Sequence, residues 1–317
     1  MSRDEEAIAA PRPLRLWEVA PKNGYALALH GGAGGRIEEL SQESRTAFEA
    51  GLRAAHHAGT AVLSSGGSAV DAVCAAVEQL ENDPLFNAGR GAALTTDGCV
   101  EHDAAVMDGE RGLAGAIAAS RFAKNPVFLA REVMERSKHL FLVRPSAELA
   151  TAWGVETAPQ DYFITEARVE QLARIRAQSG DGPRHGTVGA VARDARGNVA
   201  AATSTGGMAN QTDGRVGDSP VIGAGTYARN EIVAISCTGE GEAFIRGVVA
   251  YDIAARMRYL GSGLPDAVTQ TVETELTARG ASGGLVAVDA EGRVTVAHNS
   301  PTMFAAFDGD DGLVLLT

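Results

Sequence analysis

A glycine–threonine pair that leads into an apolar run is the feature that most restricts what this chain can fold into. His185-Gly186-Thr187 is followed directly by Val188–Ala192, which is typical of a buried strand. Because glycine has no Cβ, a threonine hydroxyl at such a strand start can approach the preceding carbonyl carbon. We therefore expect the Gly186–Thr187 bond to be cut by the chain itself. Thr187 would then carry a free α-amine, whose usual pKa of about 7.7–8.0 suits a general base.

The alternative for Gly186-Thr187 is an ordinary turn that enters a strand, so the pair needs support from the rest of the chain. That support comes from further glycine- and hydroxyl-rich motifs in a fixed order. They are His30–Gly34 upstream, then Thr203–Gly207, Gly214–Pro220, Gly223–Ala228 and Cys237–Glu242 downstream.

Together these motifs resemble the plant-type (type III) L-asparaginase / isoaspartyl peptidase family of N-terminal-nucleophile (Ntn) hydrolases, over about residues 27–296. The resemblance implies an α+β fold, the four-layer αββα sandwich of Ntn hydrolases. It also implies one domain cut into an α subunit (1–186) and a β subunit (187–317), assembled as a homodimer of αβ units. The expected reaction is hydrolysis of L-asparagine to L-aspartate and ammonia, of β-aspartyl (isoaspartyl) dipeptides, or of both.

Several residues take catalytic roles by this resemblance. Thr187 is the expected nucleophile, and Thr205 is the expected second threonine, which orients it by hydrogen bonding. Thr238, through its hydroxyl, and Gly239, through its backbone N–H, are expected to form an oxyanion hole. The structural alternatives are a strand threonine with a satisfied hydroxyl for Thr205 and a glycine turn for Gly239.

Arg215 and Asp218 are the expected substrate clamp. A guanidinium suits an α-carboxylate and a carboxylate suits an α-ammonium, so the pair would read the zwitterionic end of asparagine or of a β-aspartyl dipeptide. An exposed Arg–Asp pair, stabilising by about 0–1 kcal/mol, is the alternative. By resemblance, Gly241 adds a backbone contact and Asn87 lies near the nucleophile.

The loop around Asn87 resembles one that holds a sodium (or potassium) ion through backbone carbonyls, and a metal-free loop is the alternative. Carbonyl oxygens suit a hard cation. The carried-over ligands are the carbonyls of Leu80, Glu81, Asp83, Phe86, Ala88 and Arg90. No organic cofactor is expected.

Composition limits the partners. The net charge of −12, without a basic run, disfavours nucleic acid and anionic membranes, so the expected partner is a small-molecule substrate. Three cysteines without a CxxC pair disfavour a disulfide framework. Neither a signal-like N-terminus nor a long apolar stretch is seen, so we expect a cytoplasmic protein.

Hydrophobic periodicity predicts helices and strands along most of the chain. The predicted helices are 41–57, 68–81, one opened by Asn125-Pro126, 166–178, 242–259 and 265–279; the predicted strands are 25–30, 101–107, 187–192, 199–202, 232–237, 285–289 and 294–298. We expect a flexible tail over about residues 1–20 and a linker over about 179–186, both from their polar, Gly/Pro-containing composition.

Two rival functions remain open. A glycosylasparaginase of the same fold tends to have Asp-Thr-Ile-Gly at the nucleophile, where this chain has Gly186-Thr187-Val188-Gly189. The other is an uncleaved, non-catalytic amino-acid-binding homologue. The chain departs from the family at Asn299–Met303 and, more mildly, at Arg90, which leaves the preferred leaving group open.

Overall fold

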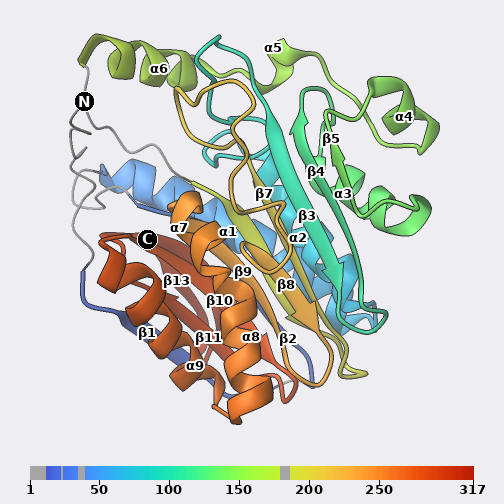
Figure 1. The fold of residues 1–317 in the computed structure, drawn as a ribbon, viewed down its shortest axis with the longest axis vertical. Helices are drawn as coiled ribbons and strands as arrows, with labels where there is room; N and C mark the ends of the chain where they lie inside the picture. The colour runs from blue at the N-terminus through green and yellow to red at the C-terminus, as the bar shows by residue number, and fades with distance from the viewer. Residues whose placement is uncertain (1–11, 23, 35–39, 179–185) are drawn as a thin grey trace.

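The computed structural model describes residues 12–22, 24–34, 40–178 and 186–317, and its strands form two sheets (Figure 1). Within those residues, the larger sheet has eight strands in the order β13-β12-β2-β6-β7-β3-β4-β5, antiparallel except for β4 with β5. Its strands are β2 (Ala26–Ala33), β3 (His102–Asp108), β4 (Leu113–Ser120), β5 (Phe141–Val143), β6 (Val188–Arg193), β7 (Val199–Thr205), β12 (Met303–Gly309) and β13 (Gly312–Leu316).

The smaller sheet is antiparallel, and its described strands run in the order β1-β11-β10-β9-β8. They are β1 (Arg15–Val19), β8 (Thr226–Arg229), β9 (Val233–Gly239), β10 (Gly283–Asp289) and β11 (Val294–His298). Arg15–Val19 belongs to the expected N-terminal tail and instead pairs with β11, so that prediction is wrong for this stretch. Residues 1–11 lie outside the described residues, as do 179–185 of the expected linker.

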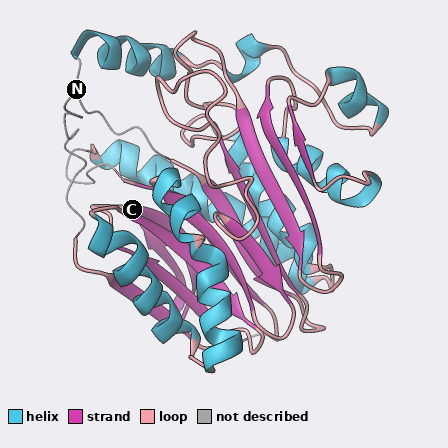
Figure 2. Cartoon of the chain, viewed as in Figure 1, coloured by secondary structure: helices cyan, strands magenta, loops and turns pink. Residues whose placement is uncertain are grey.

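Helices flank both sheets and leave the sheets facing each other (Figure 2). Near the larger sheet lie α1 (Gln42–Ser64), α2 (Ala69–Asn82) and α3 (Pro126–Arg136), and α4 (Ala147–Ala152), α5 (Gln160–Phe163) and α6 (Glu166–Gln178) follow along the chain. Near the smaller sheet lie α7 (Gly241–Gly247), α8 (Val249–Leu260) and α9 (Leu264–Thr271). These helices and sheets confirm the predicted α+β class.

Strand β2 shows how one strand serves two cores. Leu27 and Leu29 pack with the helices in one apolar cluster, whereas Ala26 and Ala28 join residues of the smaller sheet in another. Successive side chains of a strand point to opposite faces, so both faces of β2 are buried and its sequence is apolar throughout. This double burial explains why Tyr25–His30 has no polar alternation.

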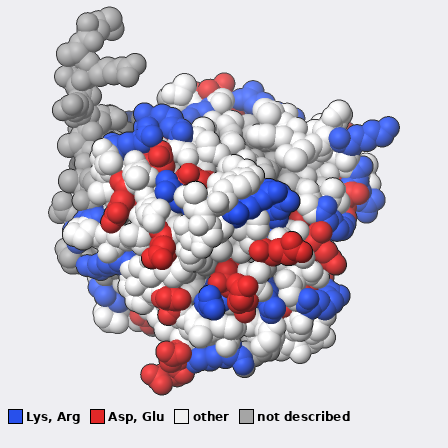
Figure 3. Space-filling model, turned by 60° about the horizontal axis from the view of Figure 1, so that its bottom comes forward, with Lys and Arg blue, Asp and Glu red and all other residues white. Residues whose placement is uncertain are grey.

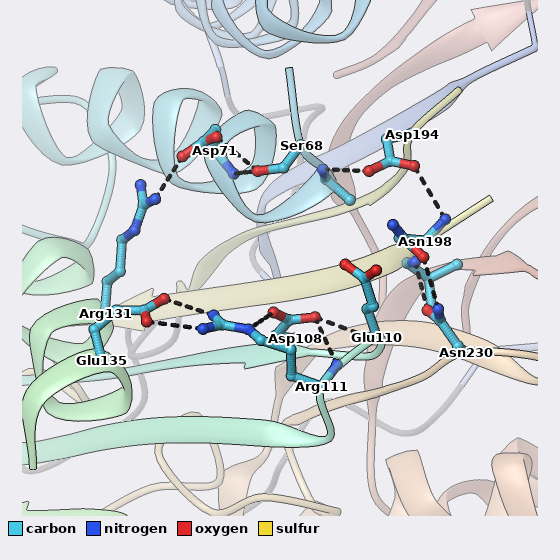
Figure 4. A network of polar contacts seen from close by, with 12 residues as sticks. Ser68, Asp71, Asp108, Glu110, Arg111, Arg131, Glu135, Asp194, Asn198 and Asn230 are labelled. Atoms are coloured by element: carbon cyan, nitrogen blue, oxygen red, sulfur yellow. Dashed lines mark hydrogen bonds and ion pairs between the residues drawn. The ribbon is translucent and has the colours of Figure 1, made fainter. Parts of the chain in front are cut away.

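A polar network closes the end of the larger sheet away from Thr187 (Figure 4). The guanidinium of Arg111 binds Asp108 at 2.5 Å and Glu135 at 2.6 Å. The carboxylate of Asp194 accepts from the backbone N–H of Ala69 at 3.3 Å, at the start of α2. These contacts tie the β3–β4 and β6–β7 turns to helices α2 and α3.

The predicted helix starts at Ser41 and Ser68 are confirmed, since each hydroxyl caps the N–H of the residue three further on. Asn125 precedes a helix that Pro126 opens, as predicted, but its amide donates to Asn82 and does not cap. The predicted helix 242–259 is broken at Val248, whose φ of 46° divides α7 from α8.

Helix 265–279 is likewise not one α-helix. After α9 the helix widens into a π turn (Val272–Leu276) and then tightens into a 3₁₀ turn (Thr277–Arg279). None of the helices in the described part of the chain combines the length and apolar character needed to cross a bilayer.

We expect Leu52→Ala in α1 to lower the free energy of unfolding by about 2–5 kcal/mol, because Leu52 is fully buried in the helix-facing core. Leu260→Ala, at a leucine that is 70% exposed, is the matched control and should change it by about 0.5 kcal/mol or less. Chemical denaturation of both variants measures the difference, and equal effects would contradict the assigned core.

Candidate active site

Thr187 lies at the entrance of β6 with its hydroxyl beside a second threonine. Its side chain is buried, and Oγ1 donates to Oγ1 of Thr205 at 3.3 Å. Thr205 is the last residue of β7, which pairs with β6, so the sheet itself brings the two hydroxyls together. The predicted pairing of these two threonines is therefore present in the fold.

The carbonyl of Gly186 receives hydrogen bonds from two side chains. Nδ2 of Asn87 donates to this oxygen at 2.6 Å, and Oγ1 of Thr205 donates to it at 3.1 Å. Two donors aimed at one carbonyl oxygen polarise it and would stabilise negative charge on it. The bond expected to break thus has an electrophilic carbonyl next to the Thr187 hydroxyl.

Asn87 is held rigidly in its loop after α2. Its Oδ1 accepts from the N–H of Ala93 at 2.6 Å, and its Nδ2 also donates to the carbonyl of Gly207 at 2.7 Å. Both ends of the amide are engaged, so the orientation of the side chain toward Gly186 is fixed. The structure therefore places Asn87 on the Gly186 carbonyl, next to Thr187, near which the resemblance had implied that it lies.

Thr238 and Gly239 end β9, in the other sheet. The hydroxyl oxygen of Thr238 accepts from the N–H of Ala33 at 3.1 Å, which leaves the hydroxyl proton available for donation. Gly239 has a φ of +136°, and a Cβ there would lie 2.4 Å from the Cα of Gly283. Only glycine fits this backbone and this close approach.

One pocket unites residues from both sheets. It is lined by Gly186, Thr187, Thr205, Gly207, Met208, Arg215, Gly217, Asp218, Ser219 and Gly239. Of the predicted catalytic and substrate-binding residues, Asn87, Thr238 and Gly241 do not belong to this lining, although each contacts or adjoins one of its residues. The Asn299–Met303 segment also lies outside this pocket lining. It contacts the His30–Gly34 motif, where the carbonyl of Thr302 accepts from the N–H of Gly34.

Arg215 is held at the pocket by a glutamate that sequence reasoning missed. Its Nε and Nη2 bind the two carboxylate oxygens of Glu242 at 3.0 and 3.1 Å, and Nη1 donates to Oε1 of Gln211 at 3.4 Å. A Cβ on Gly241 would lie 3.1 Å from Nη2 of Arg215 and 3.0 Å from Oδ1 of Asp218. Because Gly241 has no Cβ, Arg215 and Asp218 can both lie close to its backbone.

Asp218 is a buried acid that lacks a full set of partners. It is 3% exposed, and its Oδ2 has no hydrogen-bond partner among the described residues. Burial raises the pKa of Asp218 to about 7, although the charge of Arg215 opposes the shift. An unsatisfied buried carboxylate that lines a pocket is suited to a cationic group of a ligand.

His30 is a site residue that the sequence analysis missed. Its Nδ1 lies 2.8 Å from the carbonyl oxygen of Thr187, so Nδ1 carries the proton, and Nε2 then accepts from the Ser236 hydroxyl at 2.9 Å. Burial lowers the pKa of His30 to about 4, which keeps the ring neutral at ordinary pH. The sequence analysis used His30 only as part of the His30–Gly34 motif, because the pairing of its strand with β6 appears only in the fold.

The loop after α2 leaves carbonyl oxygens without their usual helical donors. The carbonyl of Leu80 would accept from residue 84, but Pro84 has no N–H. The carbonyl of Glu81 accepts from the N–H of Arg90 at 2.7 Å, which closes the loop on itself. Backbone carbonyls of this kind suit a monovalent cation, so the cation site stays a prediction; no cluster of metal-binding side chains occurs among the residues described.

Two sheets that carry a strand-start threonine beside a second threonine place the protein in the class of Ntn hydrolases. The asparaginase family model matches residues 23–315, and this chain belongs to that family.

Curated relatives cover nearly the whole chain. An isoaspartyl peptidase of Salmonella typhimurium is 49% identical over 90% of this chain and 95% of its own length. An isoaspartyl peptidase of Escherichia coli is 46% identical over 89% of this chain and 92% of its own. A probable isoaspartyl peptidase/L-asparaginase 2 of Arabidopsis thaliana is 40% identical over 92% and 98%.

We expect Asp218→Asn to raise the melting temperature at about pH 8. The usual pKa of 3.8 is raised to about 7 in the fold, so between these values the unfolded chain releases a proton that the folded protein keeps. The contribution of Asp218 to stability therefore falls as pH rises, and the gain from Asp218→Asn should vanish near about pH 4.

Thermal melting from about pH 4 to pH 8 measures this difference. Asp97→Asn, at an exposed aspartate, is the matched control and should show no pH-dependent gain. A melting temperature of Asp218→Asn below that of the wild-type protein at high pH would contradict the claim that burial raises the pKa of Asp218.

Proposed function

We propose that this chain is a self-activating threonine amidohydrolase that acts on the side-chain amide of L-asparagine and on β-aspartyl dipeptides. The observation that carries the proposal is the Gly186 carbonyl, held by Asn87 and Thr205 beside the Thr187 hydroxyl. The names of the curated relatives agree with this activity. No observation favours a glycosylasparaginase or a non-catalytic homologue.

Self-cleavage begins when Oγ1 of Thr187 attacks the carbonyl carbon of Gly186. Asn87 and Thr205 stabilise the charge that develops on the carbonyl oxygen. Breaking the C–N bond moves the acyl group from nitrogen to oxygen, the hydroxyl proton passes to the released amine, and water then hydrolyses the ester. The products are residues 1–186 and a chain that begins with Thr187.

Substrate turnover repeats this chemistry on an external amide. The freed amine of Thr187 takes the hydroxyl proton, the hydroxyl oxygen attacks the side-chain carbonyl, and the proton is passed to the departing ammonia or amino acid. The Thr238 hydroxyl and the Gly239 N–H would stabilise the tetrahedral oxyanion. Water then cleaves the aspartyl ester, and L-aspartate leaves.

Arg215 and Asp218 bind the end of the substrate that does not react. The α-carboxylate would pair with Arg215, and the α-ammonium would supply the missing partner of Asp218. This binding orients the β-amide toward Thr187 from a fixed distance. Asparagine and β-aspartyl dipeptides share this clamped end, so one pocket serves both.

The remaining assignments extend this proposal. We infer the four-layer αββα sandwich from the two facing sheets and their helices, and a homodimer of αβ units from the family. The carbonyls of Leu80, Glu81, Asp83, Phe86, Ala88 and Arg90 would hold a Na⁺ or K⁺ ion, whose charge would rigidify the Asn87 loop.

Figure 3 shows acidic and basic side chains interspersed on one face, in keeping with a small-molecule partner. The cytoplasmic location stays a prediction, and His185 lies outside the described residues.

We expect Thr187→Ala to remain a single chain of 32.7 kDa without activity, because it lacks the attacking oxygen. The wild-type protein should give two fragments by mass spectrometry, release ammonia from asparagine and release leucine from β-aspartyl-leucine. Thr187→Ser keeps a hydroxyl and should still be cut. Cleavage of Thr187→Ala at the same bond would refute the assigned nucleophile.

We expect Asn87→Ala to slow self-cleavage by roughly 10²-fold or more, as for loss of one oxyanion donor. Asn230→Ala removes an amide in the β8–β9 turn, away from the pocket, and should be processed at the wild-type rate. A time course of fragment formation on a denaturing gel measures both rates. Equal rates would show that Asn87 does not assist the attack on Gly186.

A further inference from the structure

Two carboxylates beside the active site have no role in the reaction described above. Glu101 directly precedes β3 and Asp103 is its second residue, so their side chains, two positions apart in extended chain, lie on one face. His102 between them points the other way, onto Phe163 and the carbonyl of Gly89. The shared face looks toward residues 211–218, called the clamp loop here because it carries Arg215 and Asp218.

Asp103 joins the clamp loop to β4 through its two carboxylate oxygens. Oδ1 accepts from the N–H of Ala119 at 2.9 Å, and Oδ2 accepts from the N–H of Gly217 at 3.4 Å. Gly217 directly precedes Asp218, and Asp103 itself is only 4% exposed. A buried carboxylate with backbone donors on both sides fixes the position of both backbones.

Ala119 shows that this contact stabilises an unusual backbone. Its φ is +53°, a region that disfavours residues with a Cβ, and it lies where the β3–β4 register shifts. The Asp103 carboxylate satisfies the N–H that this irregularity leaves outside the strand ladder. Asp103 is therefore tied to a rigid support on one side and to the clamp loop on the other.

Glu101 anchors the far end of the same loop through arginines. Its Oε1 accepts from Arg121 at 2.7 Å and from Arg144 at 3.2 Å, and Arg144 also binds Asp213 of the clamp loop at 2.7 Å. Asp213 is 59% exposed, so this outer link is the weaker of the two. The inner link through Asp103 is the one next to Asp218.

We propose that Asp103 is a positioning residue for the substrate clamp, whose carboxylate holds the Gly217 backbone so that Arg215 and Asp218 face the pocket. The inference rests on the proposed function, since it assigns the clamp to substrate binding. Asp103 touches no reacting atom and acts through the clamp loop alone.

The charge of Asp103 acts on the same two residues. It attracts Arg215, and it helps to raise the pKa of Asp218, whose burial is the larger cause. Within the described part of the chain, the other charged and titratable groups that face this pair are Glu101 just before β3, Glu242 on α7 and Cys237 on β9. Burial also raises the pKa of Asp103 itself, to about 6.

The test is Asp103→Asn, which keeps the shape and an acceptor for Ala119 but turns an amide donor toward the Gly217 N–H. We expect KM for asparagine and β-aspartyl-leucine, and Kd for L-aspartate by calorimetry, to rise about tenfold, as for one unsatisfied buried group. kcat and the rate of self-cleavage should stay within about twofold of wild type, because Thr187, Thr205 and Asn87 keep their contacts.

A pH series supplies a readout that a purely structural role would not move. In the wild-type protein, L-aspartate binding should strengthen as pH rises through about 7, because only ionised Asp218 attracts the ammonium. Asp103→Asn removes a negative neighbour, so the midpoint of this dependence should move to lower pH.

Two controls separate position from stability. Asp194→Asn alters another buried carboxylate with backbone donors, at the opposite end of β6, and should lower stability without changing KM. Ala119→Gly relieves the left-handed alanine and should leave KM unchanged. If Asp103→Asn fails to fold, the double variant Asp103→Asn with Ala119→Gly replaces it in every measurement.

Three results are decisive against the proposal: unchanged KM and Kd, an unmoved pH midpoint, or slowed self-cleavage with unchanged KM. The last would mean that Asp103 acts through Thr205, its cross-strand neighbour. A wild-type protein that releases neither ammonia nor leucine would overturn the proposed function instead. L-aspartate calorimetry would still report on the clamp in that case.

Discussion

The carbonyl oxygen of Gly186 is the point on which the site depends. Asn87 and Thr205 donate to it from a loop and from a strand end, and the Thr187 hydroxyl lies beside it. The same hydroxyl serves the proposed maturation and the proposed turnover, so one arrangement of donors has to be correct before the chain is cut. The rigid setting of Asn87, with both ends of its amide engaged, meets that demand.

The two sheets contribute the residues around the Gly186 carbonyl from two sides. The larger sheet delivers Thr187 and Thr205 on paired strands, and the smaller sheet delivers Thr238 and Gly239 at the end of β9. His30 joins the two, since its ring links the Thr187 carbonyl to Ser236 of the smaller sheet. A neutral, buried ring with both nitrogens engaged holds the Thr187 backbone against the second sheet.

The proposed substrate clamp, Arg215 and Asp218, differs from the setting of Thr187 because one of its buried charged groups lacks a full set of hydrogen-bond partners. Arg215 is satisfied by Glu242 and Gln211, whereas Asp218 has a raised pKa and an unpaired oxygen among the described residues. A buried carboxylate without a full set of partners lowers the stability of the empty protein. Binding of an ammonium group to it restores that stability. Asp103 adds a second buried carboxylate behind the loop, which increases both the order of the clamp and its cost.

The sequence by itself determined the family, the α+β class and the strands around Thr187, because several glycine- and hydroxyl-rich motifs occur along the chain in a fixed order. The catalytic and binding roles that it assigned stay predictions, although the fold gathers Thr187, Thr205, Arg215, Asp218 and Gly239 around one pocket. The sequence did not predict β1, β4, β5, β8, β12 or β13, because strand formation depends on pairing with neighbouring strands as well as on local propensity. It also did not find His30, Glu242 or Asp103. Their roles arise from contacts across 157, 27 and 114 positions of the chain, and only the fold brings such partners together: strand pairing for His30, and the position of the 211–218 loop against α7 and β3 for Glu242 and Asp103.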